Sequence, residues 1–128
     1  MSIAYSLLFL LAHHSTDCSE PLTQQAMNHC AGVEFEEADK ALNEQWRKTA
    51  AEMRRLDAAT DYDDGRPGYF ENLLAAQRAW LTFRDRHCAS EGYFARGGSL
   101  EPLLVATCKT ELTRDRTEQL KELADRPN

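Results

Sequence analysis

Large apolar residues recur at steps of three and four along three long segments of this 128-residue chain. In the segment from Glu34 to Leu56 they are Phe35, Leu42, Trp46, Met53 and Leu56. This spacing places them on one face of a helix, because an α-helix has about 3.6 residues per turn. No stretch alternates apolar and polar residues with a period of two, as a half-buried strand would. The chain is therefore predicted to be all-α.

Two further segments carry the same kind of stripe and predict two more long helices. One spans Phe70 to Cys88, with apolar side chains at helical spacing. The other follows Ser99, whose side-chain oxygen can cap the first turn, and ends before Pro127. Helices of this length joined by short connections favour a bundle.

A shorter helix is expected ahead of the first long one. Thr23 can cap its start, and Gly32 is expected to end it. The connections at residues 60–68 and 92–98 are rich in turn-forming residues, so they are predicted to be a turn and a loop. The prediction is an all-α bundle of three long helices plus one short N-terminal helix, in a single domain over residues 18–128.

The N-terminus carries an apolar run too short to span a bilayer. The run from Ile3 to Ala12 has the length of the hydrophobic region of a secretory signal, and no second such run follows. Residues 1–17 are therefore predicted to be a signal peptide, which implies export. The alternative is an apolar helix that stays and packs on the domain.

Four cysteines in so short an exported chain predict two disulfides. In an antiparallel hairpin of the last two helices, Cys88 and Cys108 reach similar heights, so they form the first expected pair. Cys18 lies five residues before Thr23, and this segment can fold back to let Cys18 reach Cys30. The sequence leaves crossed pairings open.

Metal ligands and catalytic groups are not arranged in any established pattern. His-Cys neighbours at 29–30 and 87–88 would supply two histidines and two cysteines for zinc, but adjacent helical residues point about 100° apart. The acidic stretch TDYDDG lacks the spacing of a calcium loop, and no nucleophile elbow, phosphate-binding glycine loop or CxxC pair occurs. We therefore expect no bound metal, no cofactor and no enzymatic activity.

The chain is acidic, because 15 Lys and Arg face 21 Asp and Glu, for a formal charge of −6. A general nucleic-acid binder needs a basic surface that releases phosphate counterions, so we expect no nucleic-acid partner. The acidic excess falls in residues 17–71, which carry −7, whereas residues 72–128 carry +1. The N-terminal half is the expected acidic face.

Several polar residues lie on otherwise apolar stripes. Gln77 and Arg84 alternate with Trp80, and Arg116 lies four residues from a leucine on either side. A polar group in such a position needs a partner. Asp39, on the stripe of the first long helix, is the expected one. We interpret Asp39, Gln77, Arg84 and Arg116 as a structural polar cluster rather than a ligand pocket.

The loop EGYFARGGS differs in character from the rest of the chain. Tyr93, Phe94 and Arg96 are residue types enriched where proteins bind one another, and the flanking glycines predict a mobile loop. We interpret these three residues as candidate partner-binding residues. The alternative is that one of the two rings caps the core of the bundle.

Two blocks of the sequence together resemble the LprI-type lysozyme-inhibitor family. The first is DCSEPLTQQAMNHCAGVEFEEADKALNEQW, with two cysteines twelve residues apart, a TQ pair and an ADxxLN run. The second comprises AAQRAWLTFRDRHC, then GGS, Cys108 and the spacing of Leu112, Arg116 and Leu120. The resemblance extends over nearly all of residues 17–123.

The resemblance implies a secreted, all-helical, disulfide-bonded envelope protein and, less directly, a lysozyme inhibitor. Such a protein would act by contact with lysozyme or another secreted protein, without a cofactor and without spanning a membrane. The lipoprotein signal of some family members is absent, so a periplasmic or secreted location is expected. Two other functions stay open: a structural or stress-related envelope protein, and an immunity or chaperone partner of another secreted protein.

Overall fold

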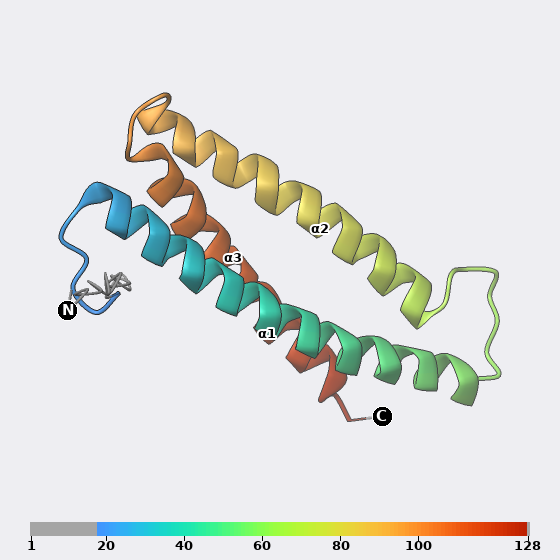
Figure 1. The fold of residues 1–128 in the computed structure, drawn as a ribbon. Helices are drawn as coiled ribbons and strands as arrows, with labels where there is room; N and C mark the ends of the chain where they lie inside the picture. The colour runs from blue at the N-terminus through green and yellow to red at the C-terminus, as the bar shows by residue number, and fades with distance from the viewer. Residues whose placement is uncertain (1–17, 128) are drawn as a thin grey trace, which may run out of the picture.

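The computed structural model describes residues 18–127, which form an all-helical fold without strands (Figure 1). The elements are α1 (Gln24–Ala59), α2 (Tyr69–Gly92), a short 3₁₀ helix η1 (Tyr93–Ala95) and α3 (Glu101–Ala124). The predicted all-α class with three long helices is confirmed. The predicted signal peptide, residues 1–17, lies outside the described residues.

The prediction of a separate short N-terminal helix is wrong, because α1 runs unbroken for 36 residues. Thr23 caps its start as predicted: its Oγ1 accepts a hydrogen bond from the backbone N–H of Ala26 at 3.0 Å. Gly32, expected to end a helix, lies inside α1, and no atom outside its own helical turns comes within 4 Å of the position its Cβ would take. An isolated glycine costs a helix about 1 kcal/mol relative to alanine, which weakens the helix without ending it.

The three helices are arranged so that α3 packs against both of the others (Figure 1). Thr49 Oγ1 donates to the carbonyl of Leu120 at 2.8 Å, and Asn28 Nδ2 donates to the carbonyl of Ser99 at 2.8 Å. Both contacts join residues 71 apart, so α1 and α3 run parallel. In Figure 1, α2 runs antiparallel to both.

The apolar core lies in the half of the bundle nearer the α1–α2 connection. Its buried members are Leu42, Met53, Leu73 and Leu120, and the partly buried residues packed on them are Trp46, Leu56, Phe70, Trp80 and Leu123. Four of the five large apolar residues of the first predicted stripe are among them, and Phe35 is the one that is not. No helix in residues 18–127 is long and apolar enough to cross a membrane.

Two disulfides hold the other half of the bundle. Cys88 and Cys108 join α2 to α3 with their Cα atoms 5.5 Å apart, and both are buried. Cys18 and Cys30 tie the segment before α1 back onto its second turn, with a Cα separation of 5.4 Å. The predicted pairs are confirmed.

The start of α3 differs from the prediction that Ser99 caps it. The residue at the cap is Leu100, and no side chain there bonds to the helix backbone. The carbonyl of Ser99 instead accepts the hydrogen bond from Asn28 on α1, so this residue joins α3 to α1. Pro102 lies in the first turn, where a missing N–H is tolerated.

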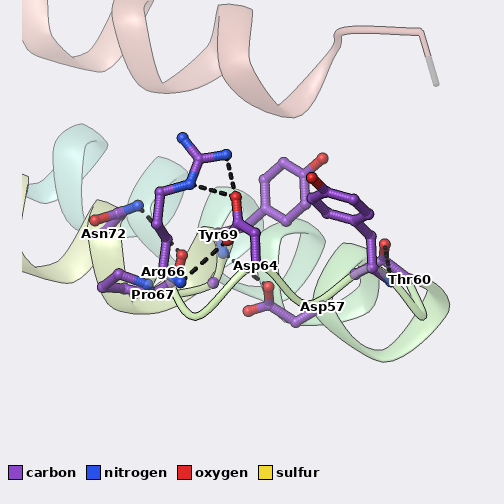
Figure 2. Close-up of a pocket in the computed structure, with 9 residues that line it drawn as sticks. Asp57, Thr60, Asp64, Arg66, Pro67, Tyr69 and Asn72 are labelled. Atoms are coloured by element: carbon purple, nitrogen blue, oxygen red, sulfur yellow. Dashed lines mark hydrogen bonds and ion pairs between the residues drawn. The ribbon is translucent and has the colours of Figure 1, made fainter.

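The start of α2 is capped from a distant part of the sequence. Asp57, in the last turn of α1, accepts hydrogen bonds from the backbone N–H groups of Tyr69 at 2.7 Å and Phe70 at 3.1 Å. Asp57 and Tyr69 are labelled in Figure 2. The intervening Gly68 has no side chain, and a Cβ there would lie 2.5 Å from Asp57 Oδ1. Asp57 therefore ties the first turn of α2 to the last turn of α1.

Candidate protein-binding site

The connection after α2 is a tight turn rather than an open loop. The 3₁₀ helix follows α2 directly, and the backbone N–H groups of Arg96 and Gly98 donate to the carbonyls of Tyr93 at 3.2 Å and Ala95 at 2.9 Å. Gly97 has a φ of +78°, a conformation that residues with a Cβ rarely adopt. These contacts give residues 93–98 a defined shape, which differs from the mobile loop expected from the glycines.

The two aromatic rings of this turn project away from the core. Phe94 is 93% exposed and Tyr93 is 54% exposed, so neither ring caps the bundle. The guanidinium of Arg96 lies 4.3 Å from the centre of the Tyr93 ring, within the range of a cation–π interaction. We refer to Tyr93, Phe94 and Arg96 as the aromatic turn.

The aromatic turn rests on a rigid base. The disulfide between Cys88 and Cys108 crosses the hairpin just below it. Gly92 lets α2 and α3 approach closely, because a Cβ at this position would lie 2.5 Å from Cγ2 of Val105. The Asn28 hydrogen bond to the carbonyl of Ser99 adds a support from α1. A large apolar ring is thus presented to solvent on a base held by all three helices.

Arg84 is the centre of one buried polar group. It is 7% exposed, and its Nη1 lies 3.4 Å from Asp39 Oδ1 and 3.3 Å from Thr113 Oγ1. Its guanidinium also lies 5.1 Å from the ring centre of Phe35 and 5.3 Å from that of Trp80. The partner on α1 is the one expected from the sequence.

Arg116 belongs to a second polar group. Its Nε donates to Gln77 Oε1 at 2.9 Å, and its Nη1 donates to Gln119 Oε1 at 3.0 Å. Burial lowers the pKa of the Arg116 guanidinium. The four residues of the expected cluster are therefore placed as two pairs, Asp39 with Arg84 and Gln77 with Arg116. Both pairs link helices.

The histidine and cysteine pairs considered for zinc do not form a ligand set. Cys30 and Cys88 are oxidised in different disulfides, so neither offers the thiolate that zinc needs. His87 Nε2 lies 3.4 Å from Glu91 Oε1, and its ring stacks on Phe83 at 5.2 Å. Cys108 lies close to this pair but is also in a disulfide.

Sequence reasoning missed three structurally important positions. Asp57 is a distant cap, and the signal that could have revealed it is the start of α2, GYF, which offers no capping side chain of its own. Thr49 and Thr113 are completely buried. Thr49 donates a hydrogen bond to α3, and Thr113 accepts one from Arg84. The sequence alone does not show that these threonines form buried hydrogen bonds, because their partners lie on other helices.

Comparison with known proteins identifies the chain. The family model described as "Lysozyme inhibitor LprI" matches residues 16–120, which include all four cysteines and the aromatic turn. An uncharacterized protein of Rhizobium meliloti (strain 1021) is 44% identical over 110 residues, which is 85% of this chain and 79% of that protein. No solved structure matches the chain. The chain belongs to the LprI lysozyme-inhibitor family.

Proposed function

We propose that this protein inhibits a lysozyme by direct protein–protein contact outside the cytoplasm. The observation that carries the proposal is the family match over residues 16–120, which spans both disulfides and almost the whole bundle. The protein acts by occupying a surface of its target, without a cofactor and without catalysis.

The disulfides support a location outside the cytoplasm. Structural disulfides persist in the periplasm and in secreted proteins, whereas cytosolic thiols are kept reduced. Both bridges are structural in this sense, because one joins α2 to α3 and the other fixes the segment before α1. A periplasmic or secreted protein also meets lysozyme where that enzyme attacks the cell wall.

The aromatic turn is the proposed contact element. Aromatic and arginine side chains carry most of the binding free energy in many interfaces, and Phe94 and Tyr93 offer two such rings outside the core. The disulfide at Cys88 and Cys108 fixes the base of the turn, which lowers the entropy lost on binding. Arg96, already stacked on Tyr93, adds a charged group beside the apolar surface.

The charge of the protein supports the same partner. A formal charge of −6 favours encounter with basic proteins, and many lysozymes are basic. Charge attraction of this kind raises the association rate more than it strengthens the final complex. It therefore supplements the contacts of the aromatic turn.

The test of the proposal is inhibition of cell-wall lysis by the purified, oxidised protein, measured against lysozymes of several classes. We expect saturable inhibition of at least one class with a stoichiometry of one to one. The matched control is the same protein reduced and alkylated, in which the base of the aromatic turn is no longer clamped. Undiminished lysis across all classes, together with no complex in analytical ultracentrifugation, would contradict the proposal.

A further inference from the structure

The α1–α2 connection borders a half-open pocket of about 320 Å³ at one end of the bundle, which we call the cavity and which the proposed function does not use (Figure 2). It lies between the last turn of α1 and the first turn of α2. Its lining is mostly polar and aromatic, and the residues used below are Asp57, Tyr62, Asp64, Arg66, Tyr69 and Asn72. A cavity of this size is at the small end of the range for ligand pockets.

The two carboxylates of the cavity are already engaged within the protein. Both oxygens of Asp57 accept the backbone N–H groups at the start of α2. Asp64 accepts hydrogen bonds from the backbone and the guanidinium of Arg66, and the guanidinium lowers the pKa of Asp64. Neither carboxylate is left to hold a metal ion, and two carboxylates against one arginine disfavour an anionic ligand.

The groups of the cavity that remain available to a ligand are two phenol rings, one amide and part of one guanidinium. Tyr62 is 77% exposed and Tyr69 is 52% exposed, and neither phenol oxygen has a hydrogen-bond partner among residues 18–127. Asn72 uses one amide N–H on the carbonyl of Pro67 at 3.5 Å, which leaves its Oδ1 available. Arg66 keeps N–H groups beyond those it gives to Asp64.

We propose that this cavity binds a short neutral carbohydrate chain. The C–H face of a pyranose ring packs against an exposed aromatic ring, as Tyr62 and Tyr69 offer, while hydroxyl and amide groups of the sugar pair with the planar polar groups of Asn72 and Arg66. The site is partly preorganised, because Asp57 holds the start of α2, including Tyr69, against the end of α1 before any ligand arrives.

The proposed function selects the kind of sugar, and this step rests on it. Lysozyme cleaves glycan chains of N-acetylated amino sugars, whose acetamido groups match the amide of Asn72. The cavity is formed by the α1–α2 connection, and this connection and the turn at residues 93–98 lie at opposite ends of α2 (Figure 1). Glycan and lysozyme can therefore be held at the same time. A glycan-bound inhibitor would be concentrated at the surface on which lysozyme works.

The test is a titration of the oxidised protein with a tetramer of β-1,4-linked N-acetylglucosamine, without any lysozyme present, followed by NMR and calorimetry. We expect saturable binding, with the largest amide shifts in residues 60–72. The double variant Tyr62→Ala with Tyr69→Ala should bind about tenfold more weakly, the loss expected for removing the stacked rings. Phe83→Ala is the matched control, because Phe83 is 53% exposed on α2 away from the cavity, and it should bind as the parent does.

Absence of saturation, shifts outside residues 60–72, or equal binding by the double variant would overturn the proposal. If a cell-wall stem peptide displaced the bound tetramer as effectively as unlabelled tetramer does, the cavity would be a peptide site, and the carbohydrate proposal would be overturned as well. If the double variant fails to fold, the amide shifts of residues 60–72 in the unmodified protein still test the proposal. Glycan binding without lysozyme inhibition would reject only the proposed function, and inhibition without glycan binding would reject only the present inference.

Discussion

Arg84 shows how this small protein holds a charge inside the bundle. Its guanidinium reaches Asp39 on α1 and Thr113 on α3, while Phe35 and Trp80 cover its faces. Because Asp39 is 38% exposed, water still solvates one partner, and the pair is less costly than a fully buried one. The contacts therefore serve mainly to set the positions of the helices relative to each other.

Replacing Arg84 with alanine should lower the free energy of unfolding by about 2 kcal/mol, because Thr113 loses a partner and a buried space opens between three helices. Asp85→Asn is the matched control: Asp85 also contacts Arg84 but is 53% exposed, so its effect should stay within about 0.5 kcal/mol. Urea denaturation measures both. Equal, small effects would show that Arg84 is solvated rather than buried.

The glycines of α1 and α2 act differently at the scale of the element. Gly32 lies in open space inside α1, so Gly32→Ala should stabilise the protein by about 0.5–1 kcal/mol through helix propensity. Gly92 faces Val105 at the tight end of the hairpin, so Gly92→Ala should destabilise it by about 1–3 kcal/mol. Thermal unfolding compares the two variants. A destabilising Gly32→Ala would mean that α1 is interrupted there after all.

The distant cap of α2 supports a second prediction about an element. Asp57→Ala removes the acceptor of two backbone N–H groups and should cost about 1 kcal/mol, as the loss of a helix cap does. Asp61→Ala, an exposed substitution in the same connection, should leave the unfolding midpoint unchanged. Equal midpoints for the two variants would contradict the capping role of Asp57.

Spacing along the sequence is sufficient to predict the three helices and to place Asp39 and Arg84 on their apolar stripes, because a helical stripe is a local pattern. Two predictions about helix ends were wrong. Gly32 and Ser99 have the residue types of a helix end and a cap, but α1 continues and the carbonyl of Ser99 bonds to Asn28 instead. Asp39, Gln77, Arg84 and Arg116 were predicted as one cluster without internal pairing, because the register between two helices depends on both stripes together.

In the molecule as a whole, one half of the bundle is stabilised mainly by apolar packing and the other half mainly by disulfides. The core residues Leu42, Met53 and Leu73 lie toward the α1–α2 connection, whereas Cys30, Cys88 and Cys108 lie at the opposite half. The aromatic turn is carried by the half that depends on the disulfides. Its shape is therefore tied to the redox state of the protein.

Thiol titration of the denatured protein should find no free thiol before reduction and four after it. Each bridge should contribute roughly 3 kcal/mol in the loop-entropy model, since both close short loops. In the reduced protein, hydrogen exchange should accelerate first around Cys30 and Cys88 and last around Leu42 and Leu73. Uniform acceleration along the chain would contradict this division of the bundle.

The most direct test of the account is the inhibition of a susceptible lysozyme by the parent protein and by a triple variant, Tyr93→Ala with Phe94→Ala and Arg96→Ala. Phe83→Ala serves as the control with a ring of similar exposure outside the turn. The rings of the turn are not part of the core, so the triple variant should keep the helicity of the parent and lose inhibition at both low and high salt. Inhibition equal to that of the parent would show that the turn is only a connector and that the binding surface lies on the helices.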